Sequence, residues 1–418
     1  MSLILHDTDR AILSGEQGPA AAFAHQILTA FAHSVNARAM IDVSGAHIDG
    51  CLYHGQVSLD FVERLLALGG RVKVLTTLNV GSLDLIHPEI MLQDKVEQVP
   101  LRRLMTAHEE LGCQSTYTCA PYQTMFRPRF GEQIAWGESN AIVFANSVIG
   151  ARTNRYGDFI DLCCAVTGRA PGYGLHLEEN RIGEILFRLE GFDSAELERD
   201  SLFTAVGIIV GLKTGDRIPV IEGLPRPRDE DQLKGLGAAA ASSGAVGMFH
   251  AVGITPEAET LADALGGREP IATFVIKPAD VRHALEHLSQ ARDGSPLTAV
   301  CLGTPHFSRG EWDRLLALLR LSQVGSRIPI YVNTGRETLD CLNQSRSFDG
   351  VQHFDIRPVV DTCTYITAIL EKLDGVVMTN SGKWAHYAPS NIGVTVAFGD
   401  MEDCVASAVA GQVVRNAR

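Results

Sequence analysis

Several features that would assign this chain to a common class are missing from its sequence. No stretch of about 18 apolar residues occurs without charges, so a membrane-spanning helix is not expected. The most apolar run, Leu202 to Leu212, is shorter and predicts a core segment. No cationic segment followed by a long apolar one opens the chain, so Met1 to Asp7 is not a secretory signal. We therefore expect a cytoplasmic protein with no membrane partner.

Basic clusters and nucleotide-binding patterns are missing as well. The formal net charge is -13 and no run of Lys and Arg is present, which disfavours a nucleic-acid partner because phosphate backbones require clustered cations. Neither a G-x-G-x-x-G nor a Walker A pattern occurs. Disorder is not expected, because 45% of the residues are hydrophobic. The 418 residues are enough for two or three domains.

The nine cysteines form no C-x-x-C pair, which disfavours a zinc ribbon. An odd number of cysteines in a large chain without a secretory signal also disfavours a disulfide framework. Each cysteine alone is most simply interpreted as a small buried hydrophobic residue. The alternative is a site assembled from cysteines that lie far apart in the sequence.

Alternating helical and short apolar segments predict an α/β protein with several domains. In the first part of the chain we expect helices over residues 8–34, 59–68, 101–111 and 158–167, and strands over 39–43, 72–77 and 116–119. We predict a first α/β domain over 1–195, a smaller α/β domain over 196–295 and a third over 296–418.

Polar residues follow several predicted strands, where ligands gather in open α/β sheets. Ser44 and His47 follow the strand over 39–43, and Asn79 follows the next one. The loop from 379 to 387 carries Lys383 together with an amide, a hydroxyl and backbone N–H groups, which suits a carboxylate or a phosphate. The simpler interpretation of His47 is a hydrogen-bonded loop histidine.

The segment from Thr116 to Arg155 is crowded with polar side chains that need partners if they are buried. Metal or cluster ligation by Cys119 beside an anion-binding pocket would explain it. A polar loop network without a ligand would explain it equally well. Composition leaves both interpretations open.

Five motifs carry a resemblance to a known family. They are Cys-Ala-Pro-Tyr from Cys119, Ala-Asn-Ser-Val-Ile-Gly-Ala-Arg-Thr-Asn-Arg over 145–155, Gly-Thr-Pro-His from Gly303, Asp-Thr-Cys ending at Cys363, and Asn-Ser-Gly-Lys-x-Ala-His-Tyr from Asn380. Together they resemble aconitase X, the divergent branch of the aconitase superfamily. The resemblance covers nearly the whole chain, and the run over 145–155 is specific.

The resemblance implies an iron–sulfur dehydratase whose large part consists of several α/β/α domains around a central iron–sulfur site. It also implies a small swivelling domain, which follows the large part in single-chain members and is a separate subunit in others. The chain stops at Arg418, just after the large part would end. We therefore expect the large subunit of a heterodimer, unless the sequence lacks a small part that belongs to it.

Two activities are known in the family: dehydration of cis-3-hydroxy-L-proline to Δ1-pyrroline-2-carboxylate, and dehydration of mevalonate 5-phosphate. The archaeal pattern for the second has Gly-Cys-Pro-His where this chain has Thr304, and Asn-Pro where this chain has Asn79-Val80. These departures favour the first activity, on a cyclic hydroxy amino acid. Mevalonate 5-phosphate dehydration is the alternative, and a cluster-free binding subunit is an alternative of another class.

The resemblance also assigns cluster and substrate residues. The expected cluster ligands are Cys119, Cys363 and, since residue 304 is not a cysteine, Cys301. So few thiolates favour a 2Fe–2S cluster, with 3Fe–4S and 4Fe–4S as alternatives. The expected substrate contacts are Ser44, Gly45, Ala46, His47, Asn79, Val80, Asn146, Ser147 and Lys383.

The expected reaction removes hydroxide from an unactivated carbon, which a Lewis-acidic iron with an open position makes feasible. Lys383 is the predicted clamp for the substrate carboxylate. Glu138, Ser139 and His47 are the predicted catalytic residues, with a serine of the small part sharing proton transfer by resemblance. Four further residues either contact the substrate or support residues that do: Asn146, Ser147, Arg152 and Asn154. The two arginines at the end of this segment, Arg152 and Arg155, are expected to be structural.

Overall fold

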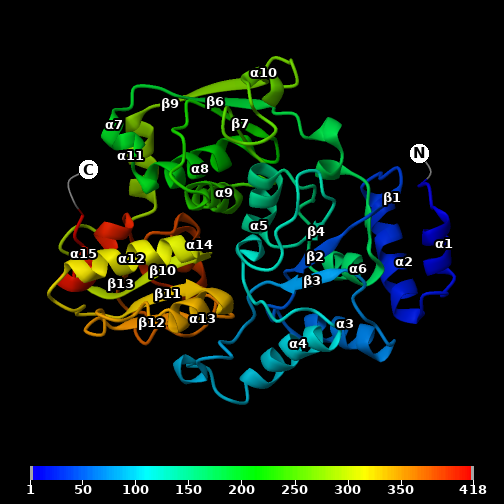
Figure 1. Ribbon diagram of the computed structural model, residues 1–418, viewed down its shortest axis with the longest axis horizontal. Coiled ribbons are helices and arrows are strands. Elements are labelled where there is room, and N and C mark those ends of the chain that lie inside the picture. Colours follow the sequence, from blue (N-terminus) through cyan, green and yellow to red (C-terminus); the bar gives the residue numbers. More distant parts are fainter. Residues whose placement is uncertain (1–2, 416–418) are drawn as a thin grey trace. The chain divides into compact units, whose positions relative to one another are not determined.

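The structure is a computed structural model that describes residues 3–415 (Figure 1). The chain forms two compact units. Unit 1 comprises Met1–Leu83, Gln93–Ile182 and Thr255–Glu257, and unit 2 comprises Asp84–Leu92, Gly183–Ile254 and Ala258–Arg418. The domain boundaries predicted near residues 195 and 295 remain predictions. Met1 and Ser2, the first two residues of the segment considered as a secretory signal, lie outside the described residues.

Unit 1 contains a parallel sheet in the order β3-β2-β4. The central strand β2 (Gly45–Ile48) pairs with β3 (Leu75–Leu78) and with β4 (Ala135–Trp136). All four residues of β2 are buried, as is typical of a strand covered on both faces. A separate antiparallel pair joins β1 (Met40–Asp42) to β5 (Arg169–Pro171).

Helices surround the strands of unit 1. They are α1 (Asp7–Leu13), α2 (Pro19–Ser34), α3 (Gln56–Ala67), α4 (Gln98–Glu110), α5 (Ser139–Phe144) and α6 (Ile160–Thr167), with the short turns η2 (Pro121–Gln123), η3 (Ala145–Ile149), η4 (Gly174–His176) and η5 (Glu178–Asn180). The single helix predicted over 8–34 is interrupted, because Gly15 and Gly18 adopt φ of 87° and 91°. The helix predicted over 59–68 corresponds to α3, which begins three residues earlier and has Gly55 as its N-cap.

Two predicted segments of unit 1 differ from the structure in a way that affects the site. The strand predicted over 39–43 corresponds to β1, so Ser44 does follow a strand. Residues 45–48, expected in a turn, form β2 themselves, so His47 lies within a strand instead of in a loop. Residues 116–119, expected as a strand, have irregular backbone, although Thr118 N donates to Leu78 O at 3.0 Å.

Unit 2 contains two fully parallel sheets. The first, in the order β8-β7-β6-β9, consists of β6 (Ile185–Leu189), β7 (Pro219–Glu222), β8 (His250–Ala251) and β9 (Ala272–Ile276). The second, in the order β12-β11-β10-β13-β14, consists of β10 (Leu297–Phe307), β11 (Ile330–Thr334), β12 (Ile356–Val359), β13 (Val376–Thr379) and β14 (Thr395–Phe398). Helices and parallel strands alternate throughout, so the predicted α/β class is confirmed.

The helices of unit 2 follow the same alternation. They are η1 (Pro88–Ile90), α7 (Ser194–Leu197), α8 (Asp200–Thr214), α9 (Glu230–Ser243), α10 (Leu261–Ala264), α11 (Pro278–His287), α12 (Arg309–Leu321), α13 (Arg336–Gln344), α14 (Gly382–Ile392) and α15 (Met401–Ala410). The segment over 379–387, expected as a loop, includes the first turns of α14. No helix within residues 3–415 is long and apolar enough to cross a membrane.

Close helix packing explains the apolar run over 202–212, which forms most of α8. This helix packs against α9 (Figure 1). A Cβ atom on Gly207 would lie 2.3 Å from Leu236 O of α9, so only glycine allows this approach. The five-stranded sheet has its own hydrophobic core. This core includes Leu302 and Val332 on the strands, Trp312 on α12 and Cys404 on α15.

Candidate functional site

His47 lies at the centre of the candidate site in unit 1. Its ring is fully buried on β2, and Nδ1 lies 2.8 Å from Thr77 Oγ1. Burial lowers the pKa of His47 to about 4, although the Glu138 carboxylate and the Thr118 backbone act in the opposite direction. Its Nε2 makes no hydrogen bond with any residue of the described chain. His47 is therefore a neutral imidazole at physiological pH with one buried nitrogen available to a ligand.

Asn79 follows β3 directly, as predicted for a residue at the carboxyl end of a strand. Its Nδ2 donates to Asp49 Oδ1, and its backbone N donates to Ile48 O at 2.9 Å. Its Oδ1 is buried without a hydrogen-bond partner in residues 3–415. Asn79 thus resembles His47 in presenting one unsatisfied buried polar atom, which a bound polar ligand could satisfy.

Asp161 supports the Asn79 side of this site and was missed in the sequence. Its Oδ2 accepts a hydrogen bond from Asp49 N at 2.8 Å, while Asp49 Oδ1 accepts from Asn79. Burial raises the pKa of Asp161 to about 8, so the side chain is mostly protonated at neutral pH. A carboxylic acid inside the otherwise apolar helix α6 was the available sequence signal.

Glu138 is fixed as the N-cap of α5. Its side chain accepts from Ala141 N at 2.6 Å and from the Asn140 side chain, and Ser139 Oγ donates to its second oxygen at 3.3 Å. Only 3% of Glu138 is exposed. The capping bonds hold this carboxylate in one orientation, close enough to His47 to influence its titration.

Asn146 and its neighbours form a polar network within unit 1. The Asn146 amide donates to Thr153 O at 2.9 Å and accepts from Thr153 N at 3.1 Å. Arg181 Nη2 donates to Asn146 O at 2.9 Å, and Arg152 Nη1 binds Glu257 Oε1 at 2.8 Å. Arg152 therefore has the structural role that we expected of it. The π-helical turn η3, which contains Asn146 and the buried Ser147, is the kind of irregularity that often occurs at functional sites.

The remaining predicted residues of unit 1 lie around β2 and the turn before η2. Ser44 is exposed and its hydroxyl donates to Glu132, whereas Gly45 and Ala46 are buried in β2. A Cβ atom on Gly45 would lie 2.3 Å from Phe126, which explains the glycine. Val80 and Cys119 are buried, with 5% and 3% exposed. The substrate and ligand roles of these residues stay predictions.

A pocket of about 340 Å³, including the space at its mouth, lies in unit 2 at the carboxyl ends of β10 and β13. Thr304, Ser381 and Lys383 border it from the strand side, and Lys234 and Glu311 border it from α9 and α12. Lys383 belongs to the first turn of α14 and is 5% exposed. This edge of a parallel sheet is where ligands bind in open α/β folds.

The Gly-Thr-Pro-His motif forms a bulge within β10 beside this pocket. The register with β11 passes from Leu302 opposite Val332 to Phe307 opposite Thr334, so the residues between leave the regular ladder. Gly303 adopts φ of 85°, and a Cβ atom there would lie 2.8 Å from Asn333 O. Bulges of this kind reorient side chains and are frequent next to active sites.

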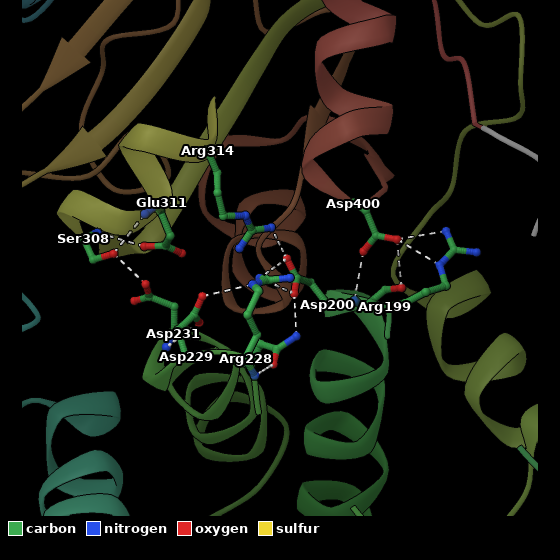
Figure 2. Close-up of polar contacts among 11 residues, drawn as sticks. Arg199, Asp200, Arg228, Asp229, Asp231, Ser308, Glu311, Arg314 and Asp400 are labelled. Atoms are coloured by element: carbon green, nitrogen blue, oxygen red, sulfur yellow. Dashed lines mark hydrogen bonds and ion pairs between the residues drawn. The ribbon is translucent and has the colours of Figure 1, made fainter. Parts of the chain in front are cut away.

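A buried ion-pair network of Lys234, Asp231 and Glu311 forms the opposite wall of the pocket. Figure 2 shows Ser308 bonded to its two acidic members, Asp231 and Glu311. Lys234 Nζ contacts Asp231 Oδ1 at 2.7 Å and the Glu311 carboxylate, and Ser308 Oγ donates to Asp231 Oδ2 at 2.6 Å. Burial alone would lower the pKa of Lys234, but Asp231 and Glu311 raise it above its usual value. Burial raises the pKa of Glu311 to about 7, against the attraction of Lys234. The network thus neutralises Lys234 locally. Sequence reasoning missed these residues, although Ser308-x-x-Glu311 has the pattern of a capping box.

Comparisons with known proteins agree with this architecture. Sequence models of the aconitase X first, second and third domains match residues 2–179, 183–286 and 297–410. This chain belongs to the aconitase X family. It is 39% identical to the cis-3-hydroxy-L-proline dehydratase of Hypocrea jecorina over 98% of the chain and 69% of that protein. It is 40% identical to the enzyme of the same name from Pseudomonas aeruginosa over 97% of the chain and 70% of that protein.

A second group of aconitase X relatives is more distant. The phosphomevalonate dehydratase large subunit of Thermococcus kodakarensis is 30% identical over 97% of this chain and all of that protein. The crystal structure of Thermococcus kodakaraensis aconitase X in its holo-form superposes with a TM-score of 0.87 and 28% identity, covering 97% of this chain and 100% of that one. The expected aconitase X fold is therefore confirmed. The curated relatives named here are dehydratases, which supports carbon–oxygen lyase chemistry for this chain.

The family suggests an iron–sulfur cluster, and cysteines of this aconitase X chain would have to bind its iron. Cys363 follows β12, is 1% exposed and lies with Sγ 3.8 Å from His306 Nε2. Cys301 is fully buried within β10, and burial raises the pKa of its thiol to about 12 while a hydrogen bond with Thr364 acts in the opposite direction. No three His, Cys, Asp or Glu side chains within residues 3–415 form a group that could hold a metal ion. The cysteines suit iron–sulfur ligation by donor chemistry; the ligand set itself stays a prediction.

Proposed function

We propose that this chain is the large part of an iron–sulfur dehydratase that converts cis-3-hydroxy-L-proline to Δ1-pyrroline-2-carboxylate and water. The observation that carries the proposal is the difference in identity between the two groups of relatives. The two proteins named for this substrate are 39% and 40% identical over nearly the whole chain. The phosphomevalonate dehydratase large subunits named from Thermococcus kodakarensis and Methanosarcina mazei are 30% and 32% identical over similar lengths.

The proposed reaction is an elimination across two ring carbons. A base removes the proton from C2, beside the carboxylate, and the hydroxyl leaves from C3. The new C2–C3 double bond gives an enamine, which tautomerises to the cyclic imine by moving one proton from nitrogen to C3. One water is released and no oxidant or reductant is needed.

The charges in the unit 2 pocket support a substrate with a single carboxylate. Lys383 is the cation that we assign to it. Lys234, the other lysine lining the pocket, is already paired with Asp231 and Glu311. A phosphate of nearly two negative charges would require more cation than this, because charged groups taken out of water need close partners. The pocket therefore favours a substrate whose only acidic group is a carboxylate over mevalonate 5-phosphate, which carries a phosphate as well.

The unit 1 residues are assigned to positioning and proton transfer. Neutral His47 and the amide of Asn79 would form hydrogen bonds with the ring nitrogen or the 3-hydroxyl through their unsatisfied buried atoms. Glu138, held by its cap, is the proposed proton acceptor, with Ser139 beside it. Ser44, Gly45, Ala46, Val80, Asn146 and Ser147 complete the proposed substrate contacts; for Asn146, whose amide is engaged with Thr153, we propose a supporting contact.

We assign cluster ligation to Cys119, Cys301 and Cys363 and favour a 2Fe–2S cluster over 3Fe–4S or 4Fe–4S. Such a cluster supplies Lewis acidity toward a leaving hydroxyl when it is bound. A small swivelling domain, as a separate subunit or a further segment, is the proposed partner. The archaeal relatives support this assignment, since their names describe large subunits.

Anaerobic co-expression of the chain with a small swivel-domain polypeptide tests the proposal. We expect brown protein that contains iron and sulfide and forms Δ1-pyrroline-2-carboxylate from cis-3-hydroxy-L-proline. Protein without iron would support a cluster-free binding subunit instead. Iron-containing protein that leaves cis-3-hydroxy-L-proline unchanged would contradict the proposed substrate.

A further inference from the structure

The side-chain hydroxyl of Thr304 is buried and forms no hydrogen bond that would stabilise the described part of the fold. The residue is 1% exposed, and Oγ1 makes no hydrogen bond with any described residue of the chain. Leaving a buried hydroxyl unsatisfied costs about 1–3 kcal/mol. Valine has nearly the same shape and would avoid this cost, so the threonine hydroxyl has to be explained by something that binds to it.

The backbone holds Thr304 in an unusual conformation next to the residues of the predicted anion clamp. Its φ is 74°, in the left-handed region that β-branched residues rarely adopt. Ser381 Oγ donates to Thr304 O, and Gly303 N donates to Asn380 Oδ1 at 3.3 Å. Ser381 is the N-cap of α14, whose second residue is Lys383. These bonds tie the bulge of β10 to the helix that carries the clamp.

Thr304 and Lys383 both line the unit 2 pocket. The pocket edge between them also includes Gly382, at the first position of α14, where the helix dipole favours an anion. On the opposite wall Lys234 donates to His306 O at 3.2 Å and is paired with two carboxylates, so this network fixes the motif that contains Thr304. The ligand facing Thr304 and Lys383 should therefore be anionic and able to accept from a hydroxyl.

We infer that the Thr304 hydroxyl donates a hydrogen bond to the carboxylate of the substrate, which Lys383 holds by charge. The inference rests on the proposed function, whose substrate carries one carboxylate. Two donors of different kinds fix the rotation of a carboxylate as well as its position, which a single lysine does not. Thr304 is thus a further substrate-binding residue, at the position where the archaeal motif has a cysteine.

Substitutions at Thr304 test this contact in the enzyme assembled with its small domain. A hydrogen bond to a charged group contributes about 1.5–3 kcal/mol, so Thr304→Val should raise KM for cis-3-hydroxy-L-proline by about 10- to 100-fold. Thr304→Ser keeps the hydroxyl and should remain within about threefold of the wild type. Thr298→Val is the matched control, because its hydroxyl bonds to Val376 O outside the pocket at the start of the same strand. An unchanged KM in Thr304→Val would overturn the inference.

Two further measurements separate a substrate contact from a structural role and from a failure of the proposed function. Without ligand, Thr304→Val should unfold at the same temperature as the wild type or higher, because it removes an unsatisfied buried hydroxyl; a lower melting temperature would overturn the inference. L-proline, which has the carboxylate but no 3-hydroxyl, should stabilise the wild type and Thr304→Ser more than Thr304→Val. Equal stabilisation of all three proteins, or of none, would overturn the inference, whether or not cis-3-hydroxy-L-proline is turned over.

Discussion

The candidate site in unit 1 and the pocket in unit 2 manage buried polar groups in opposite ways. In unit 1 burial favours the neutral forms of His47 and Asp161: it lowers the pKa of His47 to about 4 and raises that of Asp161 to about 8. In unit 2 the charge of Lys234 remains and is balanced by its contacts with Asp231 and Glu311. His47 and Asp161 are therefore suited to neutral hydrogen bonds, whereas Lys234 is part of a buried ion-pair network.

The residues that we propose as substrate contacts differ in a similar way. A ring nitrogen and a hydroxyl are best recognised by neutral donors and acceptors with fixed positions, such as His47 and Asn79. A carboxylate is best recognised by a cation together with hydroxyl or backbone donors, such as Lys383 and Thr304. Each of the following experiments tests one side of this contrast.

The largest expected effect is the loss of the cluster. The proposed ligands Cys119 and Cys363 belong to different units, and serine at either position should lower iron content and reduce kcat by at least about a thousandfold, since a Lewis acid contributes several kcal/mol. Cys341→Ser, at an exposed position on α13, is the control and should match the wild type. Full iron content in Cys119→Ser or Cys363→Ser would show that the ligand assignment is wrong.

The next effect concerns the paired charges of unit 2. Lys234→Met leaves Asp231 and Glu311 buried without their cation and should lower the free energy of unfolding by about 3–5 kcal/mol. Adding Asp231→Asn and Glu311→Gln should restore much of this loss. Lys372→Met, at an exposed position of unit 2, is the control and should change stability by less than about 0.5 kcal/mol. Urea unfolding measures the free energy of unfolding of each variant. A Lys234→Met single variant as stable as the wild type would contradict the description of this wall as a coupled network.

The next prediction concerns the part of Lys383 in substrate binding. Lys383→Met removes the proposed clamp and should reduce kcat/KM for cis-3-hydroxy-L-proline by about 100-fold, in line with losing a buried charged partner. Lys383→Arg should retain part of the activity because the charge is kept while its geometry changes. Steady-state kinetics measures both variants. An unchanged kcat/KM in Lys383→Met would show that the substrate anion does not bind in this pocket.

The last prediction concerns the pH dependence of stability contributed by Asp161. Its pKa is 3.8 in its ordinary state and about 8 when folded, so between these values the unfolded chain binds fewer protons than the folded one. Its contribution to stability therefore falls as pH rises from about 4 to about 8. Asp161→Asn should remove this fall, whereas Asp60→Asn on the exposed surface of α3 should keep it. The measurement is the free energy of unfolding in urea of the wild type and Asp161→Asn at pH 5 and pH 8. The same change with pH in both proteins would contradict the role assigned to Asp161.

The sequence predicted those features that depend on local patterns. Segments of a few residues were enough to predict the α/β alternation, the position of Asn79 after a strand and the aconitase X membership. The Lys234 network was not, because its members come from α9 and α12, and only the tertiary structure brings them together. His47 was expected in a turn because the four-residue strand β2 is too short to show a periodicity by which to recognise it. The unsatisfied hydroxyl of Thr304 could not be predicted, since satisfaction of a buried group depends on everything around it.

The most direct test of the account is the ratio of kcat/KM for cis-3-hydroxy-L-proline to that for mevalonate 5-phosphate, measured with the iron-loaded enzyme and its small domain. The account predicts turnover of the hydroxyproline and none detectable of the phosphate. Preference for mevalonate 5-phosphate would contradict the proposed substrate and with it the argument that the unit 2 pocket has too little positive charge for a phosphate.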